Sequence, residues 1–385
     1  MKRGVVVAMA WLCASPAYAQ FPGADNLIKG AKVISDLNIT PEEEYAIGQR
    51  VSATIRQRYG VVQDTSVHRY VGLVGTALAG ASTKPKLSWQ FIVLDTDGVN
   101  AFAAPGGFVH VTRGALALMT NEAELGGVLA HEVIHVTQQH TIKALKKSRI
   151  SQAGIEEGAS RAPGGGLGEA VISKLAEKAT EMVLAGFGRN EELESDDIGV
   201  VLANKVGYAP AGLGGFLTRL SERNKASTQR QGLFASHPEM KERLDRLAKG
   251  AAALKPPSTA TLEERFRQFI SYEPRPLTDI AQVEAGAAGL TGGGSTSGSG
   301  AAETKPAAKD ESKTEEPPKK KGLFGLGSKT FSGGDEKKSA QVTGSGGSRG
   351  VDTERNAKGG SNPALVSVNV TPADLQQFKA QGQLK

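Results

Sequence analysis

Two histidines, His131 and His135, stand four residues apart with Glu132 between them. They fall in a stretch, residues 113–148, whose apolar residues recur at helical spacing, which predicts a helix. Side chains four positions apart on a helix share a face about 6 Å apart, so the two imidazoles can bind one zinc ion. Glu132 can then act as general base for a water molecule that attacks a carbonyl. The motif predicts a hydrolase with one Zn²⁺ per chain.

A catalytic zinc site needs a third protein ligand and an open position. Candidate ligands lie in the acidic block at residues 191–197. Glu192 and Asp196 are four residues apart and share a helix face, so one could bind the metal while the other orients a ligand histidine. An acidic helix start that complements the helix dipole explains the same residues equally well. Spacing alone leaves this choice open.

Two further histidines are predicted to have supporting roles. His140 follows His135 by five residues, so it lies off the ligand face and is expected to support the site or to be structural. His110 lies in a predicted strand and is expected to be structural.

Several other segments occur in an order that resembles one known family. They are Asn100-Ala101-Phe102-Ala103-Ala104-Pro105-Gly106-Gly107, Thr112-Arg113-Gly114, Asn121-Glu122-Ala123-Glu124-Leu125, the histidine motif, Glu192-Leu193-Glu194-Ser195-Asp196, and Ser236-His237-Pro238 with Arg243. Over about residues 40–250 the chain resembles the soluble, secreted branch of the zinc metallopeptidases that includes HtpX, BepA and the CAAX prenyl endoproteases. Ser195 departs from the family pattern, which usually has alanine there.

The resemblance implies roles that spacing leaves open. It implies that Glu192 is the third zinc ligand and that Asp196 hydrogen-bonds a ligand histidine. His237 matches a histidine that can approach the zinc, either as a gate or to support the oxyanion. Arg243 is expected to pair with acid in the site or to stabilise the charge on the scissile carbonyl. Glu132, His237 and Arg243 are therefore the predicted catalytic residues.

The resemblance also predicts a substrate-binding segment. Residues 100–107 are expected to form a sheet edge and a turn beside the cleft, and an extended peptide can pair with such an edge through its backbone. The predicted substrate-binding residues are Asn100, Ala101, Phe102, Ala103, Pro105 and Gly106.

Local patterns predict the elements that position these residues. Helices are predicted over residues 41–59, 66–81, 169–185, 189–206, 209–224, 239–249 and 259–271, and strands over 88–95 and 108–112. Thr40 followed by Pro41 and three acidic residues is a helix start. Together with the resemblance, these elements predict an α+β fold: a mainly helical, zincin-like metallopeptidase domain, residues 20–285, with a small β-sheet beside the active-site helix.

The N-terminus has the pattern of a secretory signal peptide. Lys2 and Arg3 precede an apolar run at residues 5–13, and Ala17-Tyr18-Ala19 is a small-residue cleavage signal. Cleavage after Ala19 removes the single cysteine, which suits an oxidising compartment. The mature chain is predicted to be periplasmic or secreted.

Composition and charge set limits on the remaining regions. The 46 basic and 40 acidic residues are mixed along the chain, so a dedicated nucleic-acid binder is not expected. No later uncharged stretch approaches 18 apolar residues, so no membrane-spanning helix is predicted in the mature chain. Residues 286–360 are rich in Gly, Ser, Lys and Glu, which predicts a disordered linker. Residues 361–385 predict a short strand at 365–370 and a helix after Thr371, able to dock on the main domain or on an envelope partner.

These features favour a zinc-dependent endopeptidase that hydrolyses polypeptides of the cell envelope, with a role in protein quality control implied by the resemblance. A first alternative is a zinc-containing periplasmic chaperone or assembly factor with little or gated proteolysis, in which His237 closes the open metal position. A second alternative is an interaction scaffold that acts through residues 286–385. Neither a membrane-embedded nor a prenylated substrate is implied.

Overall fold

The computed structural model of the chain describes residues 38–148, 166–225, 240–280 and 358–385. The predicted signal peptide at 1–19, His237 and almost all of the predicted linker at 286–360 lie outside these residues, so the predicted domain boundaries stay predictions. Among the described residues, no helix has the length and apolar character needed to cross a bilayer.

A small mixed sheet lies at the centre of the domain. Its strands are β1 (Gln90–Leu94), β2 (Ala101–Ala104) and β3 (Phe108–Thr112), in the order β1-β3-β2. β1 runs parallel to β3, and β2 runs antiparallel to it after the tight turn η1 (Pro105–Gly107). Gly106 has a φ of 75°, and a Cβ there would lie 2.7 Å from the Cα of Tyr45, so the turn requires glycine. β2 is thereby an edge strand, as predicted for this segment.

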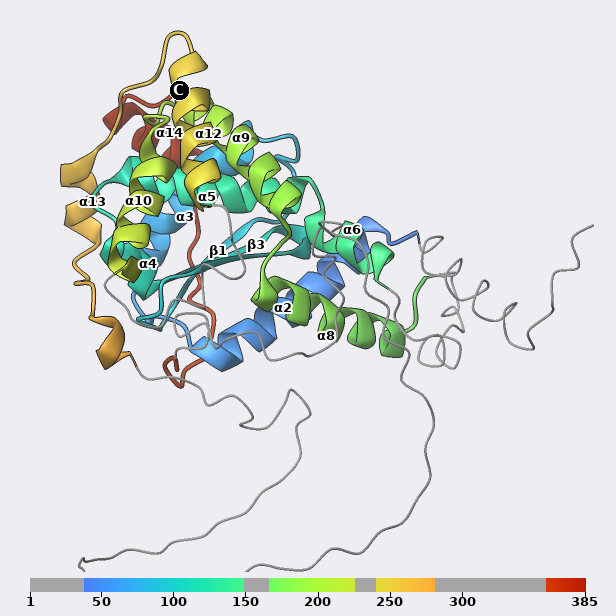
Figure 1. Cartoon of the computed structure of the whole chain (residues 1–385). Helices are drawn as coiled ribbons and strands as arrows, with labels where there is room; N and C mark the ends of the chain where they lie inside the picture. Colours follow the sequence, from blue (N-terminus) through green and yellow to red (C-terminus); the bar gives the residue numbers. More distant parts are fainter. Residues whose placement is uncertain (1–37, 149–165, 226–239, 281–357) are drawn as a thin grey trace, which may run out of the picture. The chain divides into compact units, whose positions relative to one another are not determined.

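Helices cover both faces of this sheet (Figure 1). One face packs against α3 (Thr65–Ala81) and α5 (Glu122–Thr137), and the other against α2 (Pro41–Tyr59) and α8 (Glu169–Ala185). Because side chains alternate along a strand, Val109 and Val111 join the core on the α5 side, while Phe108 joins the core on the α2 side. The predicted α+β fold, mainly helical with a small sheet, is confirmed.

Outer helices surround α5, which is buried along its whole length. The remaining elements are α4 (Arg113–Leu118), α6 (His140–Lys147), α9 (Arg189–Val206), α10 (Gly212–Lys225), α12 (Met240–Ala253), α13 (Glu263–Phe269), η2 (Leu277–Asp279) and α14 (Pro372–Gln381). Gly127 allows close packing, since a Cβ there would lie 2.5 Å from the backbone nitrogen of Leu213 at the start of α10. The central helix is therefore fixed from several sides.

The predicted helix bounds at 41–59, 169–185 and 189–206 agree with the structure. Thr40 caps α2 in a reciprocal capping box with Glu43, as its sequence predicts. The helical pattern predicted over 113–148 is confirmed, but the structure divides it into three helices, α4, α5 and α6. Asn121 caps a new helix start, and Gln139 adopts the left-handed conformation (φ 55°, ψ 39°) between α5 and α6.

The C-terminal segment, residues 358–385, packs against the domain along α2 and α3. Residues 365–370, predicted to be a strand, pair with no strand of the described chain, so that prediction is wrong. Their backbone is held by side chains instead: Arg69 donates a hydrogen bond of 3.0 Å to the carbonyl of Asn369. The predicted helix after Thr371 is present as α14, and its Phe378 is buried against Tyr70 and Arg265.

Candidate metal centre

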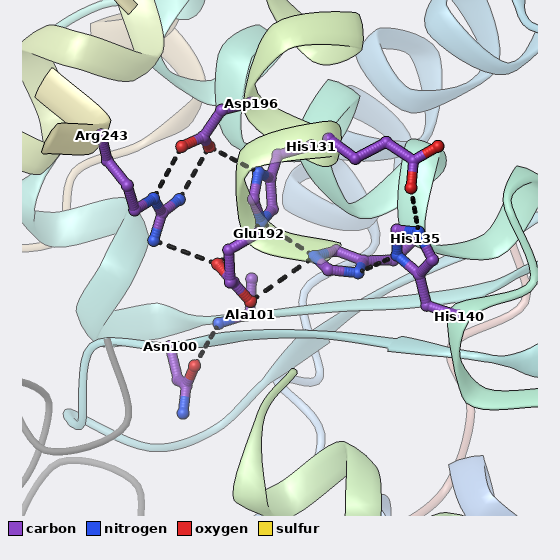
Figure 2. A network of polar contacts seen from close by, with 9 residues as sticks. Asn100, Ala101, His131, His135, His140, Glu192, Asp196 and Arg243 are labelled. Carbon is purple, nitrogen blue, oxygen red and sulfur yellow. Dashed lines mark hydrogen bonds and ion pairs between the residues drawn. The ribbon is translucent and has the colours of Figure 1, made fainter. Parts of the chain in front are cut away.

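Helices α5 and α9 bring three potential metal ligands to one point (Figure 2). The ligand atoms of His131, His135 and Glu192 lie within 4.8 Å of one another, and all three residues are buried. The two histidine Nε2 atoms are 2.9 Å apart, and oxygens of Glu192 lie 3.5 Å from Nε2 of His131 and 3.7 Å from Nε2 of His135. Tetrahedral zinc with bonds of about 2.0–2.2 Å separates its ligand atoms by roughly 3.3–3.6 Å. The two separations from Glu192 are close to this range, whereas the two Nε2 atoms are a few tenths of an ångström closer together, so a bound ion would require the histidine rings to move slightly apart.

Close packing of α9 on α5 makes this convergence possible. A Cβ added at Gly199 would lie 3.2 Å from the backbone nitrogen of His131, which is closer than a larger residue could pack without displacing the helices. Glu192 and Asp196 lie one turn apart on the face of α9 that this contact turns toward the histidines. The structure thus distinguishes the two acids: Glu192 faces both Nε2 atoms, and Asp196 faces the other ring nitrogen of His131.

His131 is held by a buried ion-pair network. Its Nδ1 lies 2.9 Å from Asp196 Oδ1, and Arg243 on α12 donates hydrogen bonds of 2.7 and 2.8 Å to the two oxygens of Asp196. Arg243 also places Nη1 3.0 Å from Glu192 Oε2. This arrangement leaves Nε2 of His131 directed at the other two ligands.

The charges of this network control protonation in the metal-free chain. Burial lowers the pKa of His131, but hydrogen bonds to Asp196 and Glu192 and their negative charges outweigh burial and raise that pKa to about 10. Burial raises the pKa of Asp196, but hydrogen bonds from Arg243 and His131 outweigh it and lower that pKa. The two acids therefore stabilise positive charge at the point where a divalent cation would bind.

His135 is held differently, by an imidazole and an aromatic ring. Its Nδ1 contacts His140, and its ring stacks on Phe187 with a centroid distance of 4.2 Å and an interplanar angle of 17°. Burial lowers the pKa of His135 well below its usual range, and the neighbouring His131 lowers it further. A neutral imidazole is the form that binds metal.

A cavity opens beside the ligand group. Its lining includes Glu132, which is 8% exposed, together with His131, His135, Glu192 and Arg243. Strand β2 forms one wall with Ala101, Phe102 and Ala103. Apolar residues form another wall: Val128, Leu213, Phe216, Leu217, Leu220 and Met240. The cavity thus joins a polar end at the ligands to an apolar region and a sheet edge.

The predicted substrate segment is only partly in this cavity. Asn100 lines it and accepts a hydrogen bond of 2.9 Å from the backbone of Ala101. The Nδ2 atom of Asn100 is buried and has no hydrogen-bond partner among the residues that the structure describes. Pro105 and Gly106 are not among the lining residues; they are buried in η1, which packs on α2. Their role in the structure is to form the turn that makes β2 an edge.

Sequence reasoning missed several residues of the site. Phe187 lies between two glycines in the connection from α8 to α9, and its spacing has no relation to the histidine motif. Glu194 belongs to the acidic block, where spacing alone indicates no partner for it, and the structure places it against His140. The apolar wall from α10 carries an ordinary amphipathic pattern, so no sequence signal distinguishes it from core.

Comparison with known proteins identifies the domain. Residues 63–251 match the family model "Peptidase family M48". The chain carries a peptidase family M48 domain. The M48 match contains every described residue of the ligand group and its ion-pair network, from His131 to Arg243.

Individual relatives agree with this M48 assignment. Over 274 residues the chain is 25% identical to the beta-barrel assembly-enhancing protease of Escherichia coli (strain K12). The aligned region covers 68% of this chain and 54% of the relative. Over 165 residues it is 34% identical to metalloprotease YcaL of the same organism, covering 42% of this chain and 63% of the relative. Over 224 residues it is 25% identical to mitochondrial metalloendopeptidase OMA1 of Schizosaccharomyces pombe, and the aligned region covers 57% of this chain and 64% of the relative. The chain spans about half the length of the assembly-enhancing proteases that it matches.

Proposed function

We propose that this chain is a zinc-dependent endopeptidase. The observation that carries the proposal is the convergence of His131, His135 and Glu192 at one end of a cavity that Glu132 also lines. The family match and the relatives named as proteases support the same activity. Zinc is the proposed metal because two imidazoles and one carboxylate, with an open position, form a typical catalytic zinc set.

In this proposal each residue has a defined task. Bound zinc would lower the pKa of a coordinated water to about 7 and polarise the substrate carbonyl. Glu132 accepts a proton from the attacking water and passes it to the leaving amine. Arg243 orients Glu192 and Asp196 through the contacts described above. An extended substrate pairs with the edge of β2, and the unpartnered Nδ2 of Asn100 is a donor for a substrate carbonyl.

We propose polypeptides of the cell envelope as substrates and protein quality control as the role. The signal-peptide pattern at residues 1–19 supports a periplasmic or secreted location, and the name of the assembly-enhancing relatives supports an envelope role. The gating role of His237 and an envelope partner for the C-terminal region stay predictions.

The proposal is tested by comparing the wild type with Glu132→Gln. Both proteins should contain about one zinc per chain, because Glu132 binds no metal in this scheme. Casein cleavage by the variant should fall about 10²- to 10⁴-fold, the usual loss when a general base is removed. Absence of zinc from the wild type, or full activity in the variant, would contradict the mechanism.

A further inference from the structure

His140 and Glu194 form a hydrogen-bonded pair on the side of His135 that faces away from the other ligands. Nδ1 of His140 lies 2.8 Å from Nδ1 of His135, and Figure 2 shows this contact between the two rings. Nε2 of His140 lies 3.1 Å from Oε2 of Glu194. His140 is buried, whereas the Glu194 side chain is 44% exposed. The three side chains form a chain of contacts from the surface to the ligand group.

The chemistry of these atoms sets the direction of the hydrogen bonds. A carboxylate only accepts, so Nε2 of His140 donates to Glu194. A neutral imidazole has one donor and one acceptor, so Nδ1 of His140 accepts from Nδ1–H of His135. The remaining nitrogen of His135, Nε2, then carries the lone pair, and this atom faces His131 and Glu192.

We propose that His140 and Glu194 are positioning residues that hold His135 in the tautomer and orientation required for metal binding. The proposal rests on the proposed function, because it concerns the metal site formed by His131, His135 and Glu192. It assigns a task to two residues outside the ligand set and outside the pair of Asp196 and Arg243.

The backbone supports this assignment. If α5 continued past Thr137 as a regular helix, five residues at about 100° each would turn His140 roughly 140° away from His135. The left-handed conformation of Gln139 ends the helix and folds His140 back onto His135. A non-glycine residue in this conformation costs on the order of 1–3 kcal/mol and persists only where surrounding contacts compensate. Contact between His140 and His135 is one such compensation.

The surroundings of His135 show why it needs an orienting partner. The connection from α8 to α9 places Phe187 against the face of the ring, which limits tilting but offers no hydrogen bond. Among the residues that the structure describes, the Nδ1 contact with His140 is the one that selects Nδ1 as the nitrogen that carries the proton. For His131, the buried carboxylate of Asp196 contacts Nδ1 directly and orients the ring in the same way. Because Glu194 is half exposed and screened by water, its effect should be smaller than that of His140.

Two nearly isosteric substitutions at His140 test the proposal. Asn can place an amide oxygen near the position of Nδ1 and accept from His135, whereas Leu leaves that donor unpaired. Zinc affinity is measured by competition with a chromophoric chelator at fixed pH. We expect His140→Leu to weaken zinc binding about 10- to 100-fold, the usual effect of removing a group that orients a ligand. His140→Asn should stay within about threefold of the wild type.

A matched pair on α9 tests the outer residue. Glu194→Ala should weaken zinc binding about tenfold, the low end of the usual range. Asp197→Ala is the control, since Asp197 lies on the same helix, pairs with Arg246 at the surface and forms no hydrogen bond or ion pair with a histidine that the structure describes. We expect the control to bind zinc with wild-type affinity.

The outcomes separate this proposal from the proposed function. If the wild type binds no zinc, the proposed function fails and this inference with it. If the wild type binds zinc and a folded His140→Leu variant binds it within about twofold, only the inference is overturned. If His140→Asn binds zinc as weakly as His140→Leu, the contribution of His140 comes from packing and not from hydrogen bonding. That result would also overturn the inference. If His140→Leu does not fold, the comparison of Glu194→Ala with Asp197→Ala decides, and equal affinities overturn the proposal.

Discussion

Arg243 binds Asp196 through two parallel hydrogen bonds, of 2.7 Å from Nε and 2.8 Å from Nη2, and both side chains are buried. The third guanidinium nitrogen lies 3.0 Å from Glu192. One side chain of α12 therefore orients both acids that α9 contributes. Burial lowers the pKa of Arg243, but Glu192 and Asp196 outweigh it and raise that pKa, so the guanidinium stays charged. The position of α12 is thus a condition for an ordered metal centre.

The first prediction concerns Arg243→Lys. A lysine cannot form the fork that reaches both oxygens of Asp196. We expect zinc affinity to fall about 10- to 100-fold. The free energy of unfolding should fall by up to about 3–5 kcal/mol, the cost of leaving a buried charge poorly paired. Arg246→Lys is the control on the same helix, because its ion pair with Asp197 is exposed and should change stability by less than about 1 kcal/mol. Equal effects of the two substitutions would contradict this account.

The second prediction concerns Asn100→Ala. The variant loses the buried Nδ2 donor that we assign to the substrate, so kcat/KM for casein or a model peptide should fall about tenfold. Zinc content should not change, because Asn100 is not a ligand. Asn190→Ala, an exposed asparagine at the start of α9, should leave kcat/KM unchanged. Loss of zinc from Asn100→Ala, or unchanged kcat/KM, would argue against the assignment.

The third prediction concerns stability in acid. His110 is fully buried between Ser52 and the carbonyl of Phe102, and burial lowers its pKa to about 3. Between pH 6.5 and pH 3 the unfolded chain carries a proton there that the folded chain lacks. The contribution of His110 to the free energy of unfolding is therefore complete above pH 6.5. It decreases by about 1.4 kcal/mol per pH unit as the pH falls from 6.5 toward 3.

His110→Gln isolates this contribution, since glutamine does not titrate. Urea unfolding is measured from pH 6.5 to 4.5 with chelator present in every sample, so that metal release does not contribute. The pH slope of the variant's unfolding free energy should be smaller by the equivalent of one proton. An identical slope in the variant would show that His110 does not titrate as described.

The fourth prediction concerns the C-terminal segment. Phe378 is buried, stands edge-on to Tyr70 and lies under the guanidinium of Arg265 at 4.0 Å. Phe378→Ala should destabilise the domain by about 3–5 kcal/mol if α14 unfolds together with it. Gln377→Ala, an exposed neighbour on the same helix, should have little effect. Limited proteolysis that releases α14 while the remaining domain keeps its Tm would show instead that the segment unfolds separately.

Local patterns were sufficient for most of the secondary structure. The start of α2 depends on the Thr40 cap and on acids in the first turn, which are interactions between neighbouring residues. The division of residues 113–148 was not predicted, because no glycine or proline marks the break at Gln139, where the backbone turns left-handed. The strand expected at 365–370 failed for a similar reason: a β-type pattern forms a strand only when a partner strand is available.

Some features of the metal site likewise follow from the sequence, and others only from the tertiary structure. Sequence alone determined the pair His131 and His135 with Glu132, because one turn of helix fixes their relative positions whatever the rest of the chain does. Spacing also placed Glu192 and Asp196 on one helix face without deciding their roles, which only the family resemblance implied. Only the tertiary structure decided that Glu192 faces the histidines, that Arg243 binds both acids, and that His140 reaches His135. These relationships depend on how α5, α6, α9 and α12 pack, and packing distances between helices are not encoded in residue spacing along any one of them.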